Sequence, residues 1–193
     1  MKTLLLTVLT LCVFIFSGNA QEASVEKSIW GIQAGLHPLG IYNETGLTES
    51  IVLRSELGFG FAWSSSGGLF DNSTAWAVMP VVIVEPRYYY NLNRRLNKGR
   101  RIEGNSGNFL ALSVGIQPDF GFTSDNVDLD KEFHVIPMWG IRRGIGNSFS
   151  FETSIGLGYG WSFDEYTLYT GERISTTDSG VVLGLRLALG YWF

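Results

Sequence analysis

The last thirteen residues, Val181-Val182-Leu183-Gly184-Leu185-Arg186-Leu187-Ala188-Leu189-Gly190-Tyr191-Trp192-Phe193, decide the fold. Every odd position is apolar and bulky, whereas the even positions from Gly184 to Gly190 are Gly, Arg, Ala and Gly. A period of two is that of a β-strand, whose side chains alternate between two faces. One face requires an apolar environment, while the other is small and carries a charge. This pattern is typical of a strand in a transmembrane β-barrel, which has lipid outside and a polar interior.

The same alternation recurs along the chain, and it is clearest over residues 148–163, where Ser, Gly and Glu alternate with bulky apolar residues. It predicts six long strands, at residues 50–63, 77–90, 109–122, 133–145, 148–163 and 181–193. The break at His37-Pro38-Leu39-Gly40 divides the remaining segment into two short strands, at about 28–36 and 39–47. An even number is needed if both ends of the chain lie on one side of the membrane. We therefore predict an all-β fold, an eight-stranded antiparallel up-and-down transmembrane β-barrel.

The connections follow from this count. The predicted loops at 64–75, 123–132 and 164–179 face outward from the cell. The turns near Leu47-Thr48-Glu49, at 91–108 and at Gly146-Asn147 face the periplasm, where short turns are usual. The connection at 91–108 is unusually long for that side.

The N-terminal segment predicts secretion. Residues 1–20 have the charged start, short apolar core and small terminal residues of a signal peptide, which leaves residues 21–193 as one outer-membrane β-barrel domain. A lipoprotein signal ending at Cys12 is the alternative. Cleavage removes Cys12, the only cysteine, and changes the formal net charge from −4 to −5. This acidic balance argues against a nucleic-acid partner.

Charged residues recur on the faces that should point into the barrel, and they comprise four Arg and four acids. Because isolated buried charges are costly, we expect them to pair and to close the lumen; a gated ion path along them is the alternative. The predicted lumen charge network is Arg54, Glu56, Glu85, Arg87, Asp119, Arg142, Glu152 and Arg186.

Aromatic residues lie near the predicted strand ends. Such rings form the interfacial girdles of membrane barrels, although a sugar-binding platform is the alternative. The predicted girdle is Trp30, Trp63, Trp76, Tyr88, Tyr90, Trp139, Trp161, Tyr191, Trp192 and Phe193.

No catalytic or metal-binding motif stands out. His134 lies beside an acidic loop, but the chain has neither a Gly-x-Ser-x-Gly elbow nor a zinc signature. The acidic run at 125–130 departs from the spacing of a calcium loop. The run at 91–101 holds five basic residues and no acid, and it either contacts inner-leaflet phosphates or cell-wall polymer, or is a solvated loop. We expect no catalytic residue, metal or cofactor.

The chain resembles the small outer-membrane β-barrel proteins of Gram-negative bacteria, the OmpA/OmpX-type transmembrane-barrel class. The features that match are the signal ending at Ala20, the alternating strands, and the terminal run at 187–193. The last resembles the C-terminal aromatic signal that the barrel-assembly machinery reads. Residues 86–108 also resemble members from Bacteroidetes-type bacteria. The resemblance is architectural and carries no catalytic residues over.

Together these observations predict a non-enzymatic integral protein of the cell outer membrane, with a closed, salt-bridged lumen and extracellular loops that serve membrane integrity or surface interaction. A lipid-modifying enzyme that uses His134 and a narrow channel for small solutes are the alternatives. The expected partners are outer-membrane lipids, lipopolysaccharide and, during insertion, the barrel-assembly machinery. We expect a monomer. A soluble periplasmic β-sandwich or lipocalin-like barrel is the structural rival.

Overall fold

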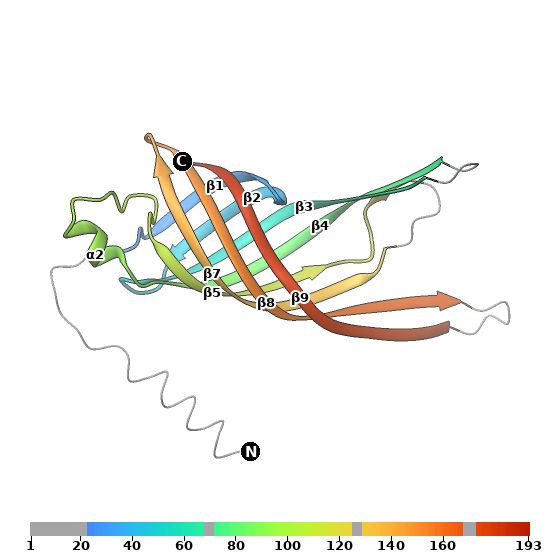
Figure 1. The fold of residues 1–193 in the computed structure, drawn as a ribbon. Coiled ribbons are helices and arrows are strands. Elements are labelled where there is room, and N and C mark those ends of the chain that lie inside the picture. Colours follow the sequence, from blue (N-terminus) through green and yellow to red (C-terminus); the bar gives the residue numbers. More distant parts are fainter. Residues whose placement is uncertain (1–22, 68–71, 125–128, 168–172) are drawn as a thin grey trace, which may run out of the picture.

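The protein is a closed ring of antiparallel β-strands in the computed structural model, which describes residues 23–67, 72–124, 129–167 and 173–193 (Figure 1). The strands are β1 (Ser28–Gly35), β2 (His37–Gly46), β3 (Ile51–Gly67), β4 (Asn72–Tyr89), β5 (Asn108–Gln117), β6 (Phe122–Thr123), β7 (Lys131–Ile145), β8 (Phe149–Thr167) and β9 (Arg173–Trp192). The helix α2 (Leu92–Leu96) has a single short turn. The predicted signal peptide lies outside the described residues, as does the stretch 125–128 of the acidic run.

Eight of these strands form the ring, and each pairs with its neighbours in chain order. The ring closes where β1 meets β9, with Gly31 opposite Trp192 and Gly35 opposite Ala188. The two-residue strand β6 pairs with β4 beyond the end of β5. These pairings confirm the predicted all-β fold of eight antiparallel strands.

The alternation in the sequence fixes which side chains enter the ring. On β8, Ser150, Glu152 and Ser154 are buried, whereas Ile155 and Leu157 are 51% and 63% exposed. On β9, Arg186 and Ala188 are buried, whereas Leu185 and Leu187 are exposed. The polar and small face therefore points inward and the apolar face outward, the reverse of a water-soluble sheet packed on an apolar core.

The two ends of the ring differ. The α2 end holds α2, the β7–β8 turn, the first described residues and the C-terminus (Figure 1). The opposite end, here called the hairpin end, is where the β3–β4 and β8–β9 hairpins extend away from each other (Figure 1). The β7–β8 connection is the predicted tight turn, with Gly146 at φ 59° between Ile145 and Phe149.

Two of the predicted loops are strands instead. Ladder pairing continues from Ile51 opposite Tyr88 to Gly67 opposite Asn72, and from Phe149 opposite Tyr191 to Thr167 opposite Arg173. Most of the segments 64–75 and 164–179 is therefore regular hairpin. On β9, residues 175–179 are exposed on both faces of the strand, a pattern that alternation of polar and apolar residues does not reveal.

The first hairpin, β1–β2, is short, as predicted. It therefore leaves a gap in the wall between β9 and β3, here called the lateral seam. β1 pairs with β9 only over residues 188–192, extended by the hydrogen bond from Leu36 N to Leu187 O. β2 pairs with β3 only as far as Leu39 opposite Phe59. Beyond these pairs, β9 and β3 run on toward the hairpin end with no described strand joining their facing edges.

Within the described residues, no helix has the length and apolar character needed to cross a bilayer.

Candidate functional site

A cluster of buried charged side chains, here called the ion cluster, fills the α2-end half of the ring interior. Each of its side chains is at most 3% exposed. The cluster is balanced, with four guanidinium groups and four carboxylates carried by strands β2, β3, β4, β7, β8 and β9. Its charged members are Glu44, Arg54, Glu56, Glu85, Arg87, Arg142, Glu152 and Arg186.

Two bidentate Arg–Glu pairs form one side of this ion cluster. Arg87 donates to both oxygens of Glu152, at 2.8 Å from Nη2 and 3.1 Å from Nη1. Arg186 donates to both oxygens of Glu85, at 2.7 Å from Nη2 and 2.9 Å from Nη1. The pairs are linked, because Arg87 Nη2 also lies 2.6 Å from Glu85 and Arg186 Nη1 lies 3.0 Å from Glu152. Bidentate geometry gives strong and directional hydrogen bonds.

Glu44 is the centre of the other side. Its Oε1 accepts hydrogen bonds from Arg54 at 3.1 Å, from Arg87 at 3.0 Å and from Arg142 at 3.2 Å. Its Oε2 accepts from Asn105 Nδ2 at 2.7 Å and from the Tyr89 hydroxyl at 3.3 Å. One carboxylate therefore links β2 to β3, β4, β7 and the connection between β4 and β5.

Neutral and aromatic side chains also contact the charged groups of the ion cluster. Gln33 donates to Glu56 and accepts from Arg54. The guanidinium of Arg54 lies 3.7 Å from the ring centroid of Tyr42, and that of Arg87 lies 4.4 Å from the ring of Phe109. Cation–π contacts of this kind strengthen when the cation is desolvated.

The structure brings together seven of the eight residues predicted for the lumen. The exception is Asp119, which lies after the end of β5 at an exposed position; its assignment to the network is corrected. Pro118 follows the last residue of β5, and proline ends a ladder because it lacks an N–H. The fourth acid is instead Glu44, which sequence reasoning missed because the outward residues of β2 include polar Asn43 and Thr45 and hide the alternation.

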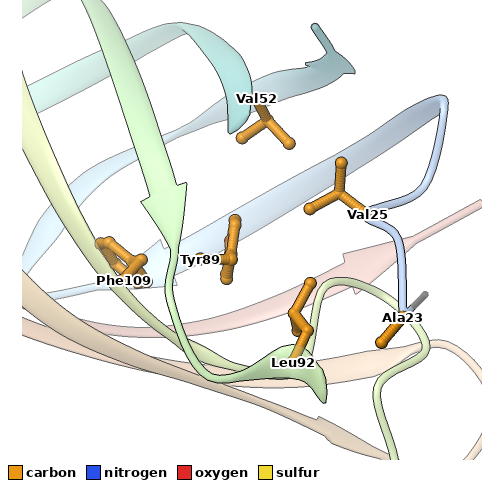
Figure 2. Packing of buried hydrophobic residues seen from close by; sticks show 6 residues of the cluster. All are labelled: Ala23, Val25, Val52, Tyr89, Leu92 and Phe109. Atoms are coloured by element: carbon orange, nitrogen blue, oxygen red, sulfur yellow. The ribbon is translucent and has the colours of Figure 1, made fainter. Parts of the chain in front are cut away.

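A small apolar core closes the ring below the ion cluster at the α2 end. Figure 2 shows its buried side chains converging from the N-terminal segment, β3, β4, α2 and β5. Its members are Ala23, Val25, Val52, Tyr89, Leu92 and Phe109. The backbone N–H of Ala23 donates to Asn93 Oδ1 at 2.8 Å, which ties the N-terminal segment to α2. The connection at 91–108, predicted as a long periplasmic turn, is thus in large part a plug that closes the α2 end of the ring.

The tip of this plug enters the ring. Gly104 and Asn105 adopt φ values of 62° and 57°, and this left-handed turn aims the Asn105 amide at Glu44. The carbonyl of Gly104 accepts a hydrogen bond from Arg142 Nε at 2.9 Å. Ser106 accepts from the backbone of Gly144 at 2.7 Å. A side chain at 104 would meet the ring of Trp192, 2.9 Å away.

A pocket of about 330 Å³ with largely apolar walls, here called the apolar chamber, lies between the ion cluster and the hairpin end. Its walls include inward side chains of β4, β5 and β7, and Arg186 lies at its inner end. It reaches Pro38, Phe61, Leu183 and Leu185, which flank the lateral seam. The apolar wall residues are Met79, Val81, Ile83, Ile136 and Met138.

His134 lies on β7 toward the hairpin end of this chamber, together with Glu132 and Gln117. Its ring packs against Gly115, where an added Cβ would be 2.2 Å from it. The histidine is therefore positioned by packing. Among the described residues, no group of three His, Cys, Asp or Glu side chains could hold a metal ion.

The outside of the ring is an apolar band with aromatic rings toward both ends. Trp30, Tyr88, Tyr90, Trp139, Tyr191 and Phe193 are exposed near the α2 end, and Trp63 and Trp76 are exposed near the hairpin end. Trp161 is half-buried and packs edge-on against Tyr159. Trp192 departs from the prediction, because it has the parity of the inward residues and packs over the plug at Gly104.

The spacing of the aromatic residues measures the band. Tyr88 and Trp76 are twelve positions apart on β4, as are Phe149 and Trp161 on β8. Twelve positions are about 40 Å along a strand and about 30 Å along the axis if the strands tilt by about 40°.

A second polar feature lies beside the plug, where α2 meets the start of β5 and the end of β7. Five basic side chains and two asparagines line a pocket of about 290 Å³, here called the basic pocket: Asn91, Arg94, Arg95, Lys98, Arg100, Asn108 and Arg143. Burial lowers the pKa of Arg95, and the neighbouring Arg100 lowers it further.

Comparison of the chain with protein families, curated proteins and solved structures found no match. The resemblance to OmpA/OmpX-type barrels therefore stays a prediction.

Proposed function

We propose that this chain is an integral β-barrel protein of a bacterial outer membrane, with a closed interior. The observation that carries the proposal is the inversion of polarity across the ring wall. Eight charged side chains are buried inside, while the outward residues are Leu, Ile, Val, Phe and Trp. In water such an exterior would be an extended exposed apolar surface, which soluble monomers rarely present.

The dimensions support the same proposal. The aromatic residues are separated by about 30 Å along the axis, which matches the hydrocarbon thickness of a bilayer. The strand pairings of the ring satisfy most backbone groups internally, apart from the facing edges of β3 and β9 at the lateral seam, and internal pairing of this kind is what a lipid environment favours. The β3–β4 and β8–β9 hairpins, which extend from the hairpin end, are then the surface presented to the outside of the cell.

The ion cluster and the plug support a structural, non-conducting role. Together they fill the α2-end half of the interior with side chains that are nearly inaccessible to solvent. We expect no ion conductance from the reconstituted protein, and we assign no catalytic role to His134.

Membrane fractionation tests the proposal. The mature protein should stay in membranes washed with alkaline carbonate, and its unboiled form should migrate faster than the boiled form in SDS gels, because the ring stays closed in detergent. Release into the soluble periplasmic fraction with no mobility shift would overturn the proposal in favour of a soluble β-protein.

A second candidate function follows from the apolar chamber. The chamber reaches the lateral seam, so an apolar molecule dissolved in the membrane has a side route into the ring that avoids the ion cluster. This favours binding or passage of small apolar molecules.

Paired substitutions on β4 test this second function. Val81 faces the chamber and Val82 faces outward, 46% exposed. Val81→Trp should abolish binding of a fluorescent apolar probe such as phenylnaphthylamine, because the indole fills the chamber, whereas Val82→Trp should leave binding intact. Equal binding by both variants would remove the chamber as the site.

A further inference from the structure

We propose that the basic pocket binds the phosphate group of an anionic phospholipid in the membrane leaflet at the α2 end. This inference rests on the proposed membrane location and adds a ligand to it. The pocket concentrates five cations around about 290 Å³, and none of its seven lining residues is acidic. A phosphate bears the complementary charge and accepts several N–H donors at once.

Local backbone structure brings these cations together. Arg94 and Arg95 lie on α2, and Gly99, at φ 62°, turns the chain back after it. The N–H of Arg100 then donates to Arg95 O at 2.9 Å, and that of Lys98 donates to the same carbonyl at 3.0 Å. The turn therefore returns Lys98 and Arg100 to the side of α2.

The guanidinium groups of Arg95 and Arg143 are held in place by neutral oxygen atoms. Arg95 donates to the carbonyl of Arg101 through Nη2 at 2.8 Å and Nε at 3.2 Å. Arg143 donates to Gly107 O at 2.9 Å and to Asn108 Oδ1 at 2.6 Å. Within the part of the chain that the structure describes, neither group forms an ion pair with a carboxylate, so their positive charge is left for a ligand. In the ion cluster, by contrast, every guanidinium faces a glutamate.

The pocket borders the apolar band, and this favours a lipid over a free ion. Asn108 in the pocket wall donates to the Tyr90 hydroxyl at 3.3 Å, which also accepts from Trp139 Nε1 at 2.8 Å. Leu110, two residues further along β5, is 51% exposed. A headgroup phosphate in the pocket would therefore leave its acyl chains against the outer face of β5 and β7.

Lipid binding to the full mature chain in dodecylmaltoside micelles tests the assignment. Bound phosphatidylglycerol and phosphatidylcholine are counted by native mass spectrometry, with inorganic phosphate as competitor. The wild type should prefer phosphatidylglycerol, and the preference should weaken with added salt. The test variant carries Arg94→Gln, Lys98→Gln and Arg100→Gln, since these exposed side chains support no backbone contact described above.

Each basic side chain near an anionic lipid strengthens binding by about fivefold. The triple variant should therefore lose phosphatidylglycerol affinity on the order of one hundredfold. The matched control removes three exposed cations elsewhere, Lys27→Gln, Lys131→Gln and Arg173→Gln, and should keep the wild-type preference. Lys98→Glu alone gives a second, less disruptive variant, which should also lower the affinity.

Each outcome decides a separate point. Unchanged phosphatidylglycerol binding in the triple variant would overturn the inference, and displacement of the lipid by equimolar inorganic phosphate would overturn its lipid source. Loss of binding in the control variant as well would show an effect of net charge and would equally overturn the pocket. Failure of the wild type to enter membranes would instead overturn the proposed function.

Discussion

Replacing Glu44 by Gln removes one negative charge from the ion cluster while keeping the volume of the side chain. In the native ring, Glu44 accepts hydrogen bonds from three guanidinium groups at 3.0–3.2 Å and is fully buried. The variant leaves four guanidinium groups facing three carboxylates. Its amide N–H₂ is a hydrogen-bond donor that faces other donors, where the native carboxylate oxygen accepted hydrogen bonds. Removing one partner from a buried ion pair costs about 3–5 kcal/mol, so the free energy of unfolding should fall by that amount.

Urea unfolding in detergent micelles, followed by tryptophan fluorescence, measures the change. The matched control is Glu49→Gln, which removes the same charge from an exposed turn and should change stability by less than about 0.5 kcal/mol. Adding Arg54→Gln to Glu44→Gln restores charge balance, so the double variant should be more stable than the sum of the two single changes implies. Equal stabilities of Glu44→Gln and Glu49→Gln would refute the reasoning.

Three further predictions concern the outer wall of the ring, the plug and Asp119. Leu157→Arg should destabilise the protein in vesicles by about 2–4 kcal/mol, and Phe163→Arg, nearer the hairpin end, by about 0–1 kcal/mol; equal and negligible effects would argue against a membrane wall. Gly104→Ala should lower stability more than Gly99→Ala, since both have φ 62° but only position 104 meets Trp192; equal losses in thermal unfolding would argue against that contact. Asp119→Asn should leave unfolding within about 0.5 kcal/mol of wild type, whereas a loss as large as that of Glu152→Gln would place Asp119 in the cluster.

Much of the ring was predictable because its two faces differ in chemistry. On β8 and β9 the outward residues are bulky and apolar and the inward residues small or charged, so parity alone predicts that Glu152 and Arg186 face the interior. Alternation gives no signal where both faces of a strand are polar. Glu44 on β2 was therefore not predicted to face the interior, and the predicted strands of the β3–β4 and β8–β9 hairpins are shorter than those of the structure.

The plug and the basic pocket could not be predicted from the alternation of side chains, because most of their residues lie outside the strands. The segment 91–108 has no period, and its structure depends on contacts with distant residues such as Ala23 and Arg142. A left-handed Asn105 between Gly104 and Ser106 is a local signal of a tight turn, but nothing local says that the turn enters the ring. The five bases at 91–101 were evident, whereas the contribution of Arg143 from β7 required the fold.

The ion cluster also constrains how the ring can assemble. Its partners are far apart in the chain: Glu44 and Arg142 are separated by 98 positions, and Glu85 and Arg186 by 101. Until β7–β9 join β1–β4, four of the eight ion pairs described for the charges on β2, β3 and β4 cannot form. Because contacts of high sequence separation form slowly, we expect a late, concerted closure, in which the last strand completes the sheet and the charge balance in one event. The same closure must be undone before the ring opens, so long persistence of the folded form is the expected result.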